Sequence, residues 1–256
     1  MFDAVLLLKL GLAPVLILAA SLAGNRWGNT VSGWIVGLPL TSAPVIFILA
    51  LEQGGDFAAA SAQGSMLGLA SLSAFSLVFS LLILRMRFDW KPAIAVGWVV
   101  FFLASFLLEG VNVPLVVSFV GVSVWLVFVA RLFPKTDATL ESGKSDWRDI
   151  AIRMVAAVSL IFAVTEFAPT LGPRLSGLLT LFPVYTSVLA ASIYRREGAA
   201  SSALFVRGAT LSLFTAVVFW LIVGSTIAAW GVGYSYISAI AVSLVVHWAT
   251  LRILRR

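Results

Sequence analysis

The feature that most restricts the fold of this chain is a series of apolar stretches about 20 residues long. A helix of about 20 residues crosses the hydrocarbon core of a bilayer. Hydrophobic residues make up 61% of the 256 residues and charged residues only 11%. The stretches do not alternate with polar residues in segments of roughly ten, as a membrane barrel would require. We therefore expect an all-α integral membrane protein.

Nine stretches are long enough to span a membrane, and they predict nine transmembrane helices. They cover residues 5–23, 31–51, 57–84, 92–108, 113–133, 150–167, 175–194, 199–223 and 230–253. With this count nearly all Lys and Arg residues fall on one side, which is the pattern of cytoplasmic loops. We expect the N-terminus outside, and the C-terminus and the loop 134–147 in the cytoplasm. The short loops and the charge bias favour a plasma membrane, specifically a bacterial inner membrane.

The second feature is an internal duplication, in which matching residues recur 144 positions apart without a gap. The matched pairs are Gly28/Gly172, Ser32/Ser176, Gly33/Gly177, Pro39/Pro183, Gly54/Gly198, Ala59/Ala203, Gly64/Gly208, Phe75/Phe219 and Leu77/Leu221. Because five spans precede the second copy, its orientation in the membrane is inverted. The chain then divides into a four-helix repeat (1–110), a connecting helix and cytoplasmic loop (111–147), and a second, inverted four-helix repeat (148–256).

Inverted repeats are found in secondary transporters, which bind a solute between the two halves. The alternative is that duplication merely built a larger stable bundle. The paired prolines, Pro39 and Pro183, point to a site because each lies near the middle of its span and frees backbone groups there. Hydroxyl side chains follow both prolines, at Thr41 and Ser42 and at Tyr185 and Thr186. An ordinary proline kink with hydroxyls bonded to the preceding turn is the other interpretation.

Arg207 is the second pointer to a site, because it lies about eight residues into its span, where an arginine is costly. Its repeat mate is Gln63, and we expect both side chains to approach the midplane between the repeats. Snorkelling of Arg207 to the cytoplasmic headgroups is the alternative. The basic repeat mates Lys9 and Arg153 lie near opposite membrane faces, where headgroup anchoring explains them and attraction of a solute is the less favoured role.

The segment 175–223 resembles the small bacterial GlpM-type membrane proteins, which consist of one four-helix unit. The matching positions are Gly177, Leu178, Phe182, Pro183, Gly198 and Gly208, with Gly33, Pro39, Gly54 and Gly64 in the first half, where Leu38 replaces the phenylalanine. The resemblance implies a fused, inverted pair of such units. It implies no substrate.

These observations predict a transporter-like protein that moves a small anionic or zwitterionic solute by alternating access. The predicted substrate-binding residues are Pro39, Thr41, Ser42, Gln63, Pro183, Tyr185, Thr186 and Arg207. The alternative is a non-transporting scaffold or assembly partner of an envelope process. Without cysteine, with one histidine and without a catalytic motif, we expect no enzyme, metal or cofactor. The expected partners are the lipid bilayer and the solute, not nucleic acid, and homo-oligomerisation stays open.

Overall fold

The computed structural model of the chain describes residues 2–27, 39–134, 136 and 146–254. These residues form helices and contain no β-strand. Six helical segments are long and apolar enough, by length and composition, to cross a membrane. This agrees with the predicted all-α membrane protein. The predicted repeat residues Gly28, Ser32 and Gly33 lie outside the described residues, as does Leu38, where the first half departs from the GlpM-type pattern.

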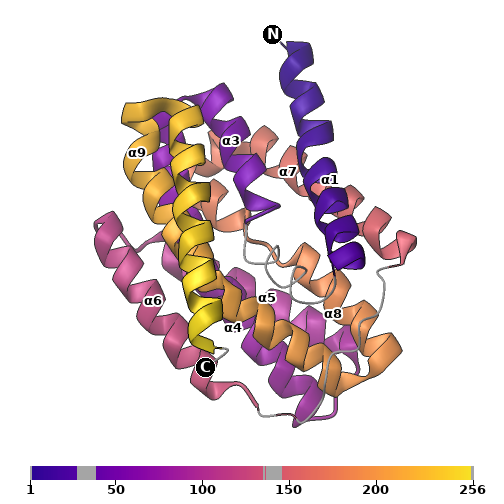
Figure 1. The fold of residues 1–256 in the computed structure, drawn as a ribbon. Coiled ribbons are helices and arrows are strands. Elements are labelled where there is room, and N and C mark those ends of the chain that lie inside the picture. The colour runs from indigo at the N-terminus through magenta and orange to yellow at the C-terminus, as the bar shows by residue number, and fades with distance from the viewer. Residues whose placement is uncertain (1, 28–38, 135, 137–145, 255–256) are drawn as a thin grey trace.

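Figure 1 shows the helices in their order along the chain. They are α1 (Phe2–Trp27), α3 (Ser42–Gln53), α4 (Gly55–Leu84), α5 (Trp90–Glu109), α6 (Leu115–Leu132), α7 (Trp147–Leu179), α8 (Val184–Glu197) and α9 (Ala199–Leu254). Two of these are interrupted, α7 at Gly172 (φ 74°) and α9 at Gly231 (φ 72°). At its break α9 turns back on itself as a helical hairpin.

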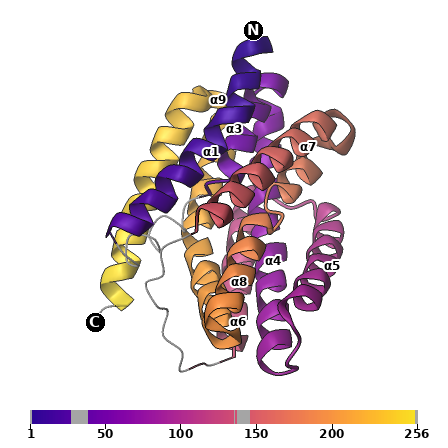
Figure 2. The same cartoon turned by 90° about the vertical axis from the view of Figure 1, so that its right-hand side faces the viewer.

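Helix α4 lies in the middle of the bundle and contacts α3, α5, α6, α7 and α9 (Figure 2). Its approach to the end of α7 depends on residues without side chains. A Cβ atom at Gly64 would overlap the carbonyl oxygen of Arg174, and one at Gly177 would overlap that of Ser61. Small residues spaced by four allow such close contact in membranes. Ser65 strengthens it, since its Oγ lies 3.1 Å from the Gly177 carbonyl oxygen and 3.0 Å from Thr180 Oγ1.

Two helix pairs are joined by a single glycine each. Gly54 joins α3 to α4 with φ 90° and ψ 172°, and Gly198 joins α8 to α9 with φ 89° and ψ −178°. Essentially only glycine adopts this backbone conformation without strain. The two joints are 144 residues apart and lie at opposite ends of the bundle in both views (Figures 1 and 2). The same separation relates Arg87 (φ 55°), between α4 and α5, to Gly231 inside α9.

Candidate functional site

The two predicted proline breaks are the points where short helices begin. Helix α3 starts at Ser42, three residues after Pro39, and α8 starts at Val184, directly after Pro183. Both starts have the same backbone hydrogen bond of 2.8 Å, from Ala43 N–H to the Pro39 carbonyl and from Ser187 N–H to the Pro183 carbonyl. Each proline therefore opens a new helix instead of bending a continuous one.

The two helix starts share a cavity of about 90 Å³. Six of the eight predicted site residues line it, namely Pro39, Thr41, Ser42, Pro183, Tyr185 and Thr186. Side chains of α4 and α9 complete the wall, including Leu69, Leu72, Ser76, Thr210, Leu213 and Ala216. This space can hold a few water molecules or a solute of a few heavy atoms.

The lining repeats itself with the spacing of the sequence duplication. Five pairs of lining residues are 144 positions apart: Pro39/Pro183, Thr41/Tyr185, Ser42/Thr186, Leu69/Leu213 and Leu72/Ala216. The cavity is therefore bounded by equivalent positions of the two halves of the chain. The prolines can be paired from the sequence, but the leucines of α4 and α9 cannot, because their apolar spans give no signal of which face meets a cavity.

The hydroxyl groups around the cavity fall into two sets. Ser76 donates a hydrogen bond to the Leu72 carbonyl and Thr210 to the Val206 carbonyl, each 2.9 Å long and one turn back along its own helix. Thr41, Ser42 and Thr186 form no side-chain hydrogen bond with any residue that the structure describes, and Ser42 is buried. Three hydroxyls are thus available to donate or accept hydrogen bonds inside the cavity.

An aromatic cluster fixes the second proline break to α5. The ring of Phe182 lies 5.3 Å from that of Trp98, 5.6 Å from that of Phe101 and 5.2 Å from that of Phe102, between centroids. The Trp98 indole N–H also donates a 3.0 Å hydrogen bond to Ser187 Oγ, in the first turn of α8. Sequence reasoning missed Trp98; its place in the middle of a predicted span, away from the interfaces, was the available signal.

The other two predicted site residues lie elsewhere in this structure. Gln63 donates hydrogen bonds from Nε2 to the Val113 carbonyl (2.6 Å) and to Ser118 Oγ (3.1 Å), which tie α4 to the start of α6. Arg207 is half-buried on α9, does not line the cavity, and forms no ion pair or hydrogen bond with the described residues. Their roles in binding stay predictions.

Two basic residues that the sequence places near the membrane faces are buried. Lys9, which is 8% exposed, forms an ion pair of 2.7 Å with Glu52 at the end of α3. Its repeat mate Arg153 is 2% exposed and donates hydrogen bonds from Nε to the Asp149 carbonyl (3.0 Å) and from Nη1 to Tyr185 Oη (3.2 Å). Their burial argues against simple headgroup anchoring, which needs side chains that reach the surface.

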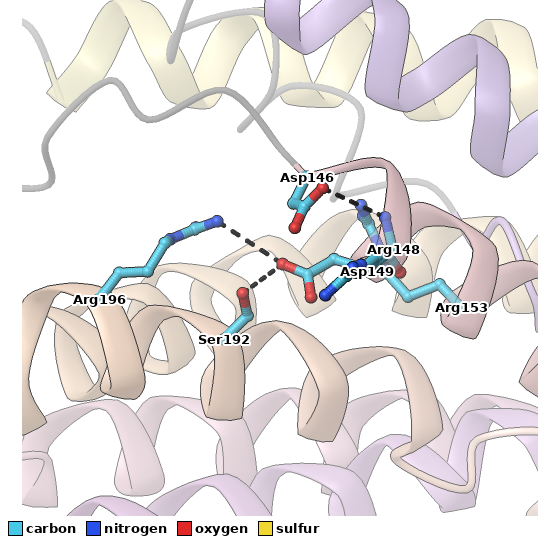
Figure 3. Close-up of polar contacts among 6 residues, drawn as sticks. All are labelled: Asp146, Arg148, Asp149, Arg153, Ser192 and Arg196. Carbon is cyan, nitrogen blue, oxygen red and sulfur yellow. Dashed lines mark hydrogen bonds and ion pairs between the residues drawn. The ribbon is translucent and has the colours of Figure 1, made fainter.

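The carboxylate of Asp149 is engaged by α8 and not by Arg153 (Figure 3). Ser192 and Arg196 both point toward it from α8; the serine donates a hydrogen bond to Oδ2, and Arg196 Nη1 lies 3.5 Å from the same oxygen. The sequence analysis did not single out Asp149, because it precedes the predicted sixth span and reads as a loop residue.

A second hollow, of about 490 Å³, lies between α4, α5 and α6. Its lining is apolar except for Ser118, with Leu67, Leu107, Val117 and Trp125 among its members. It offers little that could hold a polar solute. In the described part of the chain, no group of three or more His, Cys, Asp or Glu residues could hold a metal ion.

No protein-family model, no curated protein and no solved structure matches this chain.

Proposed function

We propose that this chain is a multi-pass membrane transporter that moves a small anionic or zwitterionic solute by alternating access between two inverted repeats. The observation that carries the proposal is the symmetry of the cavity. Five pairs of residues related by the 144-residue spacing line one space. In transporters with inverted repeats, the solute site lies at the interface of the repeats and near discontinuous helices.

The backbone supports the inverted arrangement. The glycine joints at Gly54 and Gly198 have nearly identical dihedral angles, and they lie at opposite ends of the bundle (Figures 1 and 2). A two-fold axis in the membrane plane would exchange them. If the chain crosses the membrane nine times, the breaks at Gly172 and Gly231 separate neighbouring spans. Helices α3 and α8 are then the second halves of broken transmembrane helices.

The chemistry of the cavity favours a solute that carries negative charge. Helices α3 and α8 both begin there, and a helix N-terminus presents free N–H groups and the positive end of its dipole. The hydroxyls of Thr41, Ser42 and Thr186, which have no hydrogen-bond partner in the described part of the chain, add hydrogen-bond donors. Placement in a bacterial inner membrane, with the N-terminus outside and the C-terminus in the cytoplasm, belongs to the same proposal.

The alternative is a non-transporting scaffold of an envelope process. The small volume of the cavity, about 90 Å³, favours it, because a structural bundle is expected to have a nearly filled centre. The two functions differ in one property. A transporter must open this cavity to water on each side of the membrane, whereas a scaffold has no reason to open it.

Cysteine labelling tests the proposal, because the chain has no native cysteine. We would place single cysteines at Thr41 and Thr186 in membrane vesicles and add a membrane-impermeant maleimide from either side. Exposed Lys91→Cys and Asn112→Cys serve as accessible controls, and fully buried Ala62→Cys serves as the protected one. We expect Thr41→Cys and Thr186→Cys to react from both sides. If both were as protected as Ala62→Cys, the transporter proposal would be rejected in favour of the scaffold.

A further inference from the structure

Arg153 is a buried cation without an acidic partner. Its residue is 2% exposed, and no carboxylate of the described residues lies within ion-pair distance of its guanidinium. Its repeat mate Lys9 is also buried, but Lys9 is neutralised by Glu52. A buried charge without a partner is strongly unfavourable in a protein interior or a membrane. The buried positive charge of the first half, on Lys9, is therefore balanced by an acid. The equivalent charge of the second half, on Arg153, is not.

The imbalance has a cause in the sequence. The position 144 residues after Glu52 is Arg196, so the second half has a base where the first half has the acid. The nearby acid, Asp149, is already held by Arg196 and Ser192 (Figure 3). Asp149 contributes only its backbone carbonyl to Arg153.

The donors of Arg153 are also incompletely used. Nε is bonded to the Asp149 carbonyl and Nη1 to Tyr185 Oη, while Nη2 is buried and has no hydrogen-bond partner among the described residues. The guanidinium carbon lies 5.2 Å from the centre of the Tyr185 ring. A buried donor without a partner costs free energy, so an acceptor that reached it would stabilise the protein.

Tyr185 connects this cation to the cavity. Tyr185 is one of the residues that line the cavity, and its hydroxyl oxygen accepts the hydrogen bond from Arg153. A phenol that accepts one hydrogen bond can still donate its own proton to another oxygen. The positive charge of Arg153, which is bonded to Tyr185, therefore favours an oxygen anion in the cavity beside Tyr185 and Thr186. The Thr186 hydroxyl has no hydrogen-bond partner within the described ranges and can donate to that anion.

We infer that Arg153 and Tyr185 form the recognition element for a small oxyanion, a carboxylate or a phosphate, at the wall of the central cavity. This inference rests on the proposed function, because it uses the same cavity. Neither arginine lines the cavity, but Arg153 is hydrogen-bonded to Tyr185, which does. Arg207 forms no hydrogen bond with the described residues, so the inference moves the source of anion selectivity from Arg207 to Arg153. Carboxylate and phosphate oxygens form strong, charge-assisted hydrogen bonds, so donors next to this buried positive charge suit them.

The test is thermal unfolding of the full chain in nanodiscs of phosphatidylcholine, with sodium acetate or sodium phosphate added against sodium chloride at equal ionic strength. A ligand that binds only the folded protein raises the Tm in a saturable way. We expect such a rise for the native protein. Arg153→Gln should lose the rise, and its Tm without anion should equal or exceed that of the native protein, because an unbalanced charge is gone.

Two further variants keep the test decisive. Tyr185→Phe keeps the ring and removes only the hydroxyl, so it should weaken anion binding about tenfold. Arg131→Gln removes the same charge from an exposed position at the end of α6 and should leave the rise unchanged. The inference would be overturned if the native protein showed no rise in Tm with either anion, or if Arg153→Gln showed the same rise as the native protein. If Arg153→Gln does not fold, a full rise in Tyr185→Phe would overturn it.

Two comparisons complete the test. The first distinguishes a lipid headgroup from a free anion as the ligand, and the second distinguishes failure of this inference from failure of the proposed function. A stabilising effect of phosphatidylglycerol discs without added anion, lost in Arg153→Gln, would identify a lipid headgroup as the ligand. An anion-dependent Tm together with a protected Thr41→Cys would support this site and reject transport. A labelled Thr41→Cys without any anion effect would support transport and reject this site.

Discussion

The ammonium nitrogen of Lys9 lies 2.7 Å from Oε1 of Glu52, so an ion pair connects α1 to the last turn of α3. Lys9 is nine-tenths buried, and loss of its partner leaves a charge in an apolar environment. We predict that Glu52→Gln destabilises the protein by about 2 kcal/mol, between the effects of exposed and buried pairs. Lys9→Met combined with Glu52→Gln should recover part of this loss in denaturant unfolding.

Glu109→Gln is the matched control for the ion pair, because Glu109 is exposed and its carboxylate has no ion pair or hydrogen bond with the described residues; Arg174 bonds only to its backbone carbonyl. Its stability should stay within about 0.5 kcal/mol of the native protein. If the losses of Lys9→Met and Glu52→Gln simply add in the double variant, the two side chains do not interact as described.

Gly177→Ala should be among the more damaging single substitutions. The new methyl group would overlap the backbone carbonyl oxygen of Ser61, which cannot move without displacing α4. We predict a loss of about 2 to 3 kcal/mol, the upper range for overpacking. Thermal unfolding in detergent measures it.

Gly121→Ala makes the same change on α6, where an added Cβ meets no atom within 4 Å among the described residues. It should be neutral or stabilising, because alanine favours a helix by about 1 kcal/mol over glycine. Equal stability of the Gly177 and Gly121 variants would mean that α4 and α7 are not in backbone contact.

The Trp98 hydrogen bond to Ser187 should contribute about 1 kcal/mol to holding the start of α8. Trp98→Phe keeps an aromatic ring against Phe182 and removes only the indole N–H, so it isolates this bond. Ser187→Ala removes the other partner. The double variant should be no less stable than the worse single one, as a double-mutant cycle would record; full additivity would argue that the bond does not form.

Membrane orientation gives a prediction that needs no knowledge of the solute. The excess of Lys and Arg on one side predicts that the connection between α5 and α6 lies outside and that between α4 and α5 inside. In intact cells, an impermeant maleimide should therefore react with Asn112→Cys at once. Lys91→Cys should react only after the membrane is made permeable, and the reverse pattern would invert the topology.

The sequence predicted the helical membrane fold and the residues at the two breaks, because apolar length and proline act locally. It could not predict which face of an almost uniformly apolar helix meets which neighbour. Gln63 therefore lies against α6 rather than at the cavity. Distance along a span also misjudged burial: Arg153, near the start of its span, is more deeply buried than Arg207, farther along its own.

The single-glycine joints have a consequence for chain length. At Gly54, α3 ends at Gln53 and α4 begins at Gly55, so no loop can absorb an extra residue. One residue inserted between Gly55 and Gly64 would rotate the rest of α4 by about 100° and shift it by about 1.5 Å. The Gly64 face would then turn away from α7. The single-glycine joint therefore fixes the rotation of α4 about its own axis relative to α3. Insertions here should be tolerated far less than substitutions.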